Sequence, residues 1–431
     1  MNSTFKVGIG RQDITPKIGA WLMGYAPARR AESVGDRLNL TAYAFESNGV
    51  LAIVATADVC IIDNELCKTI RREISDISGV PYDNIIICAT HTHSGPATRG
   101  TAGGADMDVE FVENIFVPAA KKAATEAMAS LRPALMGIGE INSNVGVNRR
   151  EILPDGSVTL GQNPQGTYDP IMTVVSFIEP NGKPIGNIIH YGAHNTAAGK
   201  NPEITRDWCG PAIDKLEEIS GGITSFFNGC EGDCGPRLPN GKTAANYLEA
   251  LSLGEKAALD AVSAWRSISE WHENPTLKVI TKDICLPYKA MPTEEELIKE
   301  IEEMGDPANL GGLRVLSYKA LNKRLDLLRS NQNIETEKAF STTAVCIGPL
   351  AFFPIPFEIF SRITLRIRQQ SPFRYTLSLS NANGTYFYFP SVDQIPLGGY
   401  EIWAFTTFNV QPFADDSEHY LVEGAIKLLN S

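Results

Sequence analysis

Two histidines one residue apart, His91 and His93, are the side chains of this sequence best suited to chemistry. They follow the apolar run 84–88, which is typical of a buried strand, and precede the turn residues Ser94-Gly95-Pro96. If the strand geometry continues to residue 93, both imidazoles point to the same side, because side chains alternate along a strand. Neutral imidazole binds metals and moves protons near neutral pH, so the pair predicts a metal or proton-transfer site. The alternative is that these rings only hydrogen-bond to loop carbonyls.

A second pair of histidines, His190 and His194, lies at the end of another strand-like segment. Their spacing of four places both side chains on one face of a strand or a helix. A preceding apolar run and the turn Asn181-Gly182 indicate a hairpin, which favours a strand. Four of the 6 histidines therefore lie at two predicted strand ends, whereas His272 and His419 are interpreted as surface or packing residues.

Glu358 is a carboxylate whose surroundings require a partner, because aromatic and apolar residues flank it on both sides. Buried carboxylates are rarely unpaired. A metal, an arginine or the N-terminus of a helix after Pro356 would each supply a partner, and the local pattern alone favours the helix. By the same reasoning Tyr388 and Tyr400 are core or rim aromatics and Arg149 is a surface charge, unless a site recruits them.

The composition describes a globular protein with ample core, since 43% of the 431 residues are hydrophobic and 20% are charged. The formal net charge of −12, without a dense Lys/Arg patch, argues against nucleic acid or an anionic membrane surface as a partner. No apolar stretch approaches the length of a membrane span, so no membrane anchor is expected. The N-terminus lacks a secretory pattern, and we expect a cytoplasmic protein unless a signal has been removed. The oligomeric state is not predicted by these features.

The 8 cysteines are scattered, mostly among apolar residues, and are expected to be buried thiols in a reducing compartment. Cys230 and Cys234 are separated by three residues, which is not a standard zinc spacing. A metal pair or a disulfide at these two positions is the less favoured alternative.

Strand-like segments alternate with helix-like ones, which predicts an α/β (mixed α+β) fold with a core of packed β-sheets flanked by helices. No linker or repeat divides the chain, so residues 1–431 are expected to form a single domain. The charged segment at about 292–336 is predicted to be a helical excursion, either a lid or, as we favour, a solvated helical pair. The Gly-rich stretch 99–106 is expected to form a substrate rim beside His91. The helices expected from periodicity and capping are 63–77, 108–131, 243–265, 293–303, 357–369 and 417–429, with Asp63 as the N-cap and Gly79 as the stop of the first. The expected strands are 50–56, 84–88, 135–140, 173–177, 186–191, 224–227, 276–286, 343–346 and 375–380.

Several short polar motifs follow one another along the chain. They are Gly8 to Pro16, Gly24-Tyr25-Ala26, Asp58, Ala89 to Pro96, Val147-Asn148-Arg149, Ala193-His194-Asn195-Thr196, Ile204 to Asp207, Phe227 to Pro236, Pro356-Phe357-Glu358, Tyr388 to Ser391 and Gly399-Tyr400-Glu401. In this order they resemble the N-terminal catalytic domain of the neutral/alkaline non-lysosomal ceramidase family, in the form of a short bacterial-type member. The resemblance implies that family's fold for the whole chain.

The resemblance also implies a zinc amidohydrolase site with one ion per chain. The metal ligands that it implies are His91, His194, Glu358 and Tyr388. The residues that would bind and polarise the substrate are His93, Arg149 and Tyr400. The residues implied in the surrounding loops are Asp58, Asp207, Asp233 and Gly235. Two imidazoles and a carboxylate suit zinc, which would activate water and polarise the scissile carbonyl, while His93 would pass a proton to the leaving amine. Asp207 and Asp233 would orient the histidines or, at least as well, serve as helix caps or turn residues.

The sequence departs from the family at positions that bear on the substrate. Gly235 stands where ceramidases have a serine, so an acyl-enzyme route through that hydroxyl is excluded, and a route through metal-activated water remains. Only a helix-like tail follows Tyr400, so we expect no C-terminal immunoglobulin-like domain of the kind that the family carries, and we expect no segment suited to collecting a lipid. We therefore expect a zinc-dependent hydrolase of a carbon–nitrogen (amide) bond in a small soluble substrate rather than in ceramide. The alternatives are a metal-dependent esterase or lactonase, and a non-catalytic protein that binds a metal or small ligand on the same scaffold.

Overall fold

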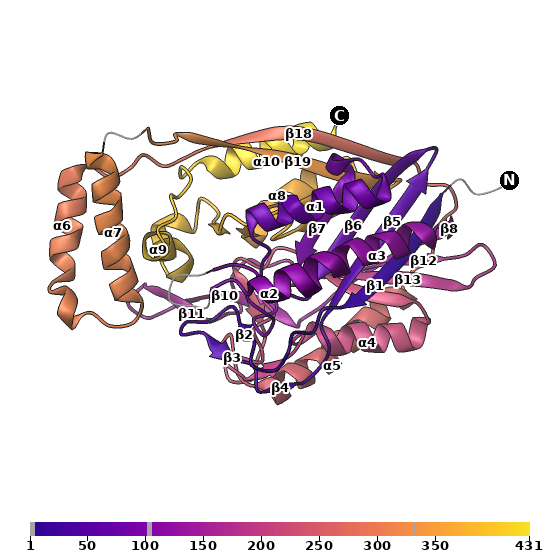
Figure 1. The fold of residues 1–431 in the computed structure, drawn as a ribbon, viewed down its shortest axis with the longest axis horizontal. Coiled ribbons are helices and arrows are strands. Elements are labelled where there is room, and N and C mark those ends of the chain that lie inside the picture. The colour runs from indigo at the N-terminus through magenta and orange to yellow at the C-terminus, as the bar shows by residue number, and fades with distance from the viewer. Residues whose placement is uncertain (1–4, 101–105, 331–332) are drawn as a thin grey trace.

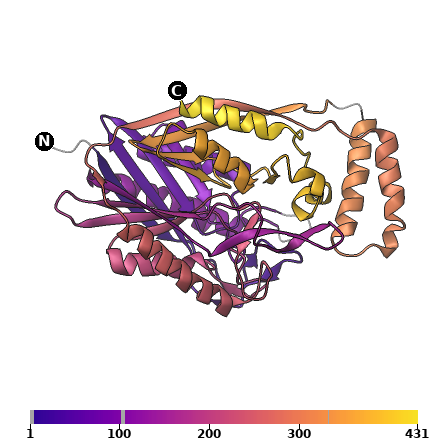
Figure 2. The ribbon, with the colours of Figure 1, turned by 180° about the vertical axis from the view of Figure 1, so that it is seen from behind.

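The structure is a computed structural model that describes residues 5–100, 106–330 and 333–431, so most of the Gly-rich stretch 99–106 lies outside the described residues. Two five-stranded sheets pack against one another, and helices cover their outer faces (Figures 1 and 2). A four-stranded sheet with its own helices packs beside them. The predicted mixed α/β fold, with packed sheets flanked by helices, is therefore confirmed.

The first sheet carries the strand that leads to His91. Its strands are β1 (Lys6–Asp13), β5 (Asn39–Ser47), β6 (Val50–Ala57), β7 (Ile85–Ala89) and β8 (Arg132–Pro133), in the order β7-β6-β5-β1-β8. The helices on its outer face are α1 (Asn64–Ser78) and α3 (Val117–Ala129), and α3 is preceded by α2 (Val109–Phe111) and a π-helical turn. As predicted, α1 is capped by the Asp63 side chain and ends at Gly79, whose left-handed conformation suits glycine.

The second sheet carries the strand that leads to His194. Its strands are β9 (Leu135–Asn142), β12 (Ile171–Ile178), β13 (Pro184–Tyr191), β15 (Ile223–Asn228) and β17 (Trp271–His272), in the order β15-β13-β12-β9-β17. The helices on its outer face are α4 (Cys209–Ser220) and α5 (Tyr247–Arg266). Buried aromatic rings fill the space between the sheets, where the Phe45 and Phe177 centroids lie 5.6 Å apart. Burial of each such side chain contributes about 1.5–3 kcal/mol to the core.

The third sheet consists of β18 (Leu277–Pro287), β19 (Glu337–Ile347), β20 (Leu350–Pro354) and β22 (Tyr375–Leu379). Helices α8 (Ser361–Gln370) and α10 (Ser417–Leu429) pack against it. Between β18 and β19 the chain forms a hairpin of two helices, α6 (Glu294–Met304) and α7 (Leu313–Arg329), which stands at the edge of the molecule (Figure 1). The hairpin contacts α9 (Tyr400–Thr407), where Ser317 Oγ lies 2.8 Å from Thr407 Oγ1.

Short strand pairs hold the loops at the ends of the long strands. These strands are β2 (Trp21–Leu22), β3 (Arg29–Arg30), β4 (Ser33–Val34), β10 (Gly146–Ile152), β11 (Val158–Asn163), β14 (Glu203–Ile204), β16 (Cys234–Pro236), β21 (Glu358–Ile359) and β23 (Tyr388–Phe389). Strand β10 pairs with β11 and β16, β21 with β23, β2 with β3, and β4 with β14. The pairings of β10 with β16, β21 with β23, and β4 with β14 connect segments that are far apart in the sequence.

Two predicted helices begin later than expected, and a further helix was not predicted, each for an identifiable reason. The helix predicted at 357–369 begins only at Ser361, because residues 358–359 are extended and pair with β23. The helix predicted at 243–265 begins at Tyr247, where the side chain of Asn246 accepts a hydrogen bond from Glu249 N. Helix α4 was not predicted, because a glycine and a proline in its first turn resemble a loop.

Two expectations about the whole chain concern its cysteines and a membrane span. Seven of the cysteines are buried free thiols, including Cys230 and Cys234, and Cys285 is exposed. The less favoured disulfide between Cys230 and Cys234 is therefore not formed. Within the described ranges, no helix combines the length and apolarity needed to cross a membrane.

Candidate metal centre and active site

The two histidines of the His-x-His motif meet at the end of β7, although the strand does not continue to them. Strand β7 ends at Ala89, and His91 has a φ of 67°, so the chain turns at this residue. The assumption of continued strand geometry is therefore wrong. The backbone N–H of His91 donates to Val59 O at 3.0 Å, which fixes the turn. The turn nevertheless brings the Nε2 atoms of His91 and His93 to 3.3 Å from each other.

His91 and His194 are oriented by backbone carbonyls. His91 Nδ1 lies 2.7 Å from Cys60 O, and His194 Nδ1 lies 2.7 Å from Glu231 O. Each Nδ1 must carry the proton that it donates, so each Nε2 keeps a free lone pair, as in metal-binding histidines. Burial lowers the pKa of His194 to about 3, so this ring is neutral at physiological pH. Both rings are thus prepared to act as ligands.

Glu358 completes a group of three possible ligands. Its Oε2 lies 3.2 Å from His194 Nε2 and 3.6 Å from His91 Nε2. All three ligand atoms lie within 4.8 Å of one another, and all three residues are buried. Burial alone would raise the pKa of Glu358, but the charge of Arg149 opposes this and the pKa lies below its usual value of 4.5, so the carboxylate is ionised. Two neutral imidazoles and one carboxylate are a donor set that fits zinc.

Tyr388 lies beside Glu358 because β21 and β23 are parallel and Glu358 is the register partner of Tyr388. The ring of Tyr388 lies 5.8 Å from that of Tyr400, the first residue of α9. The guanidinium carbon of Arg149 lies 5.5 Å from the Tyr388 ring centre. Burial raises the pKa of Tyr388 well above its usual value of 10.0, so the phenol keeps its proton. The structure therefore gathers these predicted site residues on one flank of Glu358.

Arg149 is buried, so its default interpretation as a surface charge is wrong. Its Nε donates to Glu401 Oε1 at 2.8 Å, and Arg150 Nη1 lies 2.7 Å from the other oxygen of Glu401. A carboxylate on α9 thus fixes two neighbouring arginines of β10. Sequence reasoning did not single out Glu401, whose only signal was its position directly after Tyr400.

His93 occupies the opposite flank of His91. Its ring lies 5.1 Å from that of Tyr25, in an edge-on arrangement. Burial and the neighbouring histidines lower the pKa of His93 well below its usual value of 6.5. Its Nδ1 is buried and has no hydrogen-bond partner among the described residues. A neutral imidazole here is able to accept and return a proton.

The acidic residues predicted near the site hold its loops. None of the three, which are Asp58, Asp207 and Asp233, hydrogen-bonds to a histidine ring within the described structure. Asp207 accepts from the backbone N–H groups of Ala197 and Ala198, just after His194. Asp233 accepts from the backbone and hydroxyl of Ser361, both at 2.7 Å. The predicted alternative, turn residues rather than histidine partners, describes both.

Asp58 and Gly235 are also structural neighbours of the site. Asp58 Oδ2 accepts from Asn39 N at 2.8 Å, and burial raises its pKa to about 6. Gly235 of β16 pairs with Val147 of β10, and a Cβ atom at Gly235 would lie 3.3 Å from Arg149 Cβ. The position at which the resemblance implies a serine in the family is thus directly beside Arg149.

His190 does not join the cluster, although a spacing of four suggested that it would face the same way as His194. Strand β13 ends at Tyr191, so the two histidines are no longer on one continuous strand. His190 Nε2 lies 3.0 Å from Ser378 O, between the second and third sheets. It is a packing residue, whereas His272 is half-buried and His419 is exposed at the surface.

Two further buried residues were missed by sequence reasoning. Glu231 is fully buried, and its Oε1 accepts from Asn381 Nδ2 at 2.7 Å. The same amide nitrogen lies 3.3 Å from His91 Nδ1. Burial raises the pKa of Glu231 well above its usual value of 4.5. The available signal was an acid within the apolar, Gly-rich loop that precedes β16.

A second group of possible ligands, Cys60 with His91 and His93, fits a metal less well. His91 Nδ1 is 4.0 Å from Cys60 Sγ, and this nitrogen is already hydrogen-bonded to the Cys60 carbonyl. Burial raises the pKa of Cys60 well above its usual value of 9.0, which disfavours the thiolate that metals bind. The group of His91, His194 and Glu358 is therefore the better candidate.

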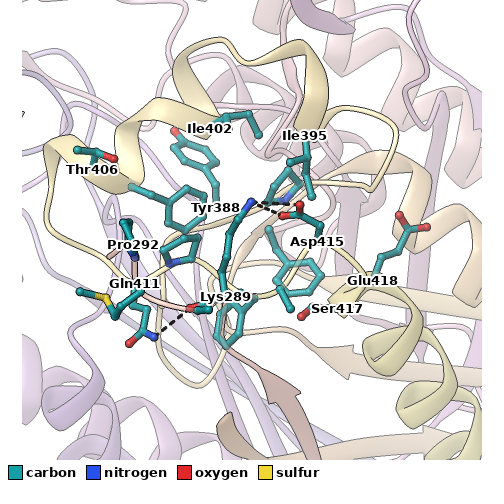
Figure 3. A pocket seen from close by; sticks show the side chains of 18 of the residues that line it. Lys289, Pro292, Tyr388, Ile395, Ile402, Thr406, Gln411, Asp415, Ser417 and Glu418 are labelled. Carbon is teal, nitrogen blue, oxygen red and sulfur yellow. Dashed lines mark hydrogen bonds and ion pairs between the residues drawn. The ribbon is translucent and has the colours of Figure 1, made fainter. Parts of the chain in front are cut away.

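A pocket of about 240 Å³ lies beside Tyr388 (Figure 3). Its wall combines aromatic side chains, including Phe389, Phe405 and Phe413, with the charged residues Lys289, Glu300, Arg324, Asp415 and Glu418. Lys289 Nζ pairs with Asp415 at 2.8 Å across it, as the dashed lines in Figure 3 show. Tyr388 lines the pocket and is the register partner of Glu358, whereas His91, His194 and Glu358 do not themselves line it.

The comparison with protein families now identifies the chain. The family model described as neutral/alkaline non-lysosomal ceramidase, N-terminal, matches residues 5–246. The chain belongs to this family. The matched range includes both histidine motifs and Arg149, whereas Glu358, Tyr388 and Tyr400 lie beyond it.

Individual members of the ceramidase family are similar to parts of the chain. Neutral ceramidase A of Dictyostelium discoideum is 28% identical over an alignment of 266 residues, which covers 54% of this chain and 36% of that protein. Neutral ceramidase of Pseudomonas aeruginosa is 27% identical over an alignment of 258 residues, which covers 54% of this chain and 37% of that protein. The chain thus spans little more than a third of these curated relatives. The crystal structure of the Pseudomonas aeruginosa ceramidase covers 100% of this chain and 75% of its own, with a TM-score of 0.74 and 19% identity. A structure described as ceramidase complexed with C2 also has a TM-score of 0.74, at 17% identity. These two likenesses show the shared fold.

Proposed function

We propose that this chain is a zinc-dependent hydrolase of carbon–nitrogen amide bonds in N-acylated amines. The observation that carries the proposal is the buried group His91, His194 and Glu358, whose histidines present free Nε2 atoms toward one carboxylate. When bound there, one zinc ion would polarise the scissile carbonyl and lower the pKa of a water toward about 7. The relatives named neutral ceramidase support amide chemistry, since a ceramide is an N-acylated amine.

The residues around this centre suit the two halves of an amide hydrolysis. Neutral His93 would accept the proton of the attacking water and deliver it to the amide nitrogen as the carbon–nitrogen bond breaks. A carbon–oxygen bond replaces it, so the products are a carboxylic acid and an amine. Arg149 and Tyr400 would stabilise the negative charge that develops on the carbonyl oxygen. Glycine at 235 supplies no hydroxyl, so this route proceeds without an acyl-enzyme.

The apolar pocket beside Tyr388 is suited to the acyl part of the substrate. Its volume of about 240 Å³ and its aromatic wall favour a short apolar chain. On this basis we retain the prediction that a small soluble N-acyl compound is a better substrate than ceramide. Faster turnover of ceramide than of short N-acyl amines would overturn that part of the proposal.

Metal content measured by elemental mass spectrometry tests the centre. We expect about one zinc per chain in the wild type and none in the double variant His91→Ala/His194→Ala, because each of the two substitutions removes a ligand. The matched control is His272→Ala/His419→Ala, which removes two histidines outside the site and should keep the metal. Zinc that remains in the first variant, or its absence from wild type after dialysis against zinc, would contradict the proposal.

Relative rates on matched ester and amide pairs test the reaction. Faster ester than amide hydrolysis would favour the esterase or lactonase alternative. Zinc bound at the site without hydrolysis of either class would favour a non-catalytic binding protein.

A further inference from the structure

Arg29 is a cation beside the candidate site that forms no ion pair with a carboxylate in the described part of the chain. It lies in β3, and its guanidinium donates to the backbone: Nη2 to His93 O at 2.6 Å and Nε to Asn201 O. Its Nη1 is buried and has no hydrogen-bond partner among the described residues. Burial lowers the pKa of Arg29, yet arginine remains charged under all ordinary conditions. A buried N–H of a cation without an acceptor is costly and calls for a partner.

The other arginine of the site with such a nitrogen is Arg149, and it differs in having an anion. Its charge is balanced by Glu401 at 2.8 Å. The carboxylates whose charges act on Arg29 are those of Asp207 and Glu203, and neither forms an ion pair with it in the described part of the chain. Asp207 uses its oxygens to accept from backbone N–H groups, and burial raises its pKa to about 6.

The unpaired charge lies on the His93 flank of the site. The Arg29 guanidinium carbon is 5.2 Å from the Tyr25 ring centre, and that ring is 5.1 Å from the His93 ring. Exposed Lys200 adds a second cation on the same side, 6.0 Å from the Tyr25 ring, where its Nζ donates to Ala26 O at 2.9 Å. The apolar pocket is lined by Tyr388, which neighbours Glu358 and Tyr400 instead. The two flanks thus differ in chemistry: within the described ranges, Arg29 Nη1 is a buried donor without an acceptor on one flank, whereas the cations of the pocket on the other flank, Lys289 and Arg324, have acceptors.

This asymmetry distinguishes the two halves of an amide substrate. With the acyl group in the pocket beside Tyr388, the amine half would lie toward His93, which is the residue placed to protonate the leaving nitrogen. A carboxylate on that amine half would lie toward Arg29 and supply the missing acceptor for Nη1. We propose that Arg29 binds such a carboxylate and that the substrates are N-acyl amino acids. This inference rests on the proposed amide hydrolase function and specifies its substrate class.

The competing explanation is that Arg29 is only structural, because it also holds the His93 carbonyl and Asn201. The two explanations differ in what happens to selectivity. A structural role would lower turnover of every amide by the same factor. A carboxylate-binding role would lower turnover of the carboxylate substrate far more than that of its uncharged counterpart.

The experiment compares kcat/KM for an N-hexanoyl amino acid and for the corresponding N-hexanoyl amino acid amide, which differ only in the charge of the amine half. We expect the wild type to prefer the carboxylate on the order of 10- to 100-fold, the usual effect of one hydrogen bond to a charged group. Arg29→Gln should abolish this preference, and Arg29→Lys should restore part of it. The matched control is Arg30→Gln, which changes the exposed neighbour that stacks on Trp21 at 4.0 Å and should leave the preference intact.

An equal fall in kcat/KM for both substrates in Arg29→Gln would overturn the inference. Turnover of ceramide by a wild type that shows no preference for the carboxylate substrate would overturn it as well. Calorimetric binding of the same two compounds separates it from the proposed function. Binding that requires both the carboxylate and Arg29, without hydrolysis, would sink the hydrolase proposal and keep the carboxylate site. Binding that is indifferent to the carboxylate or to Arg29 would overturn the site whatever the enzyme hydrolyses.

Discussion

Glu401 provides the sharpest test of how the site is held together. Its carboxylate lies between two guanidinium groups, with Arg149 Nε at 2.8 Å and Arg150 Nη1 at 2.7 Å. The three side chains are almost completely buried, with exposed fractions of 1% for Glu401, 5% for Arg149 and 1% for Arg150. The substitution Glu401→Gln keeps the shape and removes the charge, so two buried cations lose their shared anion.

The size of the effect follows from these contacts. Opposite charges about 4 Å apart attract by about 4 kcal/mol at an effective dielectric constant of about 20, so the two contacts together contribute about 8 kcal/mol. The substitution also removes the cost of taking a carboxylate out of water, which is several kcal/mol. The free energy of unfolding should therefore fall by about 3–5 kcal/mol, as is usual when one partner of a buried pair is removed.

Urea unfolding followed by tryptophan fluorescence measures this change. The control Glu110→Gln removes an exposed partner of Lys17, where the side chains are 73% and 82% exposed, and should change nothing measurable. The kcat/KM for amide hydrolysis should fall in Glu401→Gln and stay constant in the control, because only the first change releases Arg149. An unfolding free energy for Glu401→Gln equal to that of the wild type would refute the reasoning that this carboxylate holds both arginines.

Two further predictions concern residues on the other side of the site. Gly24→Ala should lower kcat at least tenfold without loss of metal. The φ of Gly24 is 108°, and a Cβ atom at this position would lie 2.4 Å from the His93 ring. Normal kcat in this variant would show that the position of His93 is unimportant. Asp58→Asn should stabilise the protein at pH 8 by up to about 3 kcal/mol, because burial raises the pKa of Asp58 from its usual 3.8 to about 6. A raised carboxyl pKa contributes stability that is complete below pH 3.8 and is lost as the pH rises through about 6, so the advantage of the asparagine should vanish near pH 4. Measurements of the unfolding free energy at pH 4 and pH 8 check this. An equal advantage at both pH values would contradict it.

Several parts of the fold and site were predictable because their signals are local. The apolar run before His91 indicated strand β7, and the caps Asp63 and Gly79 marked the ends of α1. The motif around His91 and His93 pointed to a site before any contact was known. Such features depend on residues within one turn or one strand, so the sequence pattern carries them directly.

Local pattern also produced the wrong expectations. Pro356 and the residues after it resemble a helix start, yet Glu358 is extended because it pairs with Tyr388, thirty residues later. The spacing of four between His190 and His194 suggested a shared face, but strand β13 ends between them and only His194 joins the cluster. In both cases a pairing or turn outside the local window decided the conformation.

The sequence by itself determined the fold class, the strand that leads to the first histidine pair and, through its motifs, the family. Only the tertiary structure decided which residues share the centre and which partners orient them. The carbonyls of Cys60 and Glu231, rather than any carboxylate, fix His91 and His194, and every backbone unit offers a carbonyl, so no residue type signals this role. Glu401 meets Arg149 across 252 positions, and Arg29 meets His93 across 64. Contacts of such sequence separation depend on how the sheets and short strand pairs pack, because periodicity and capping describe only neighbours along the chain.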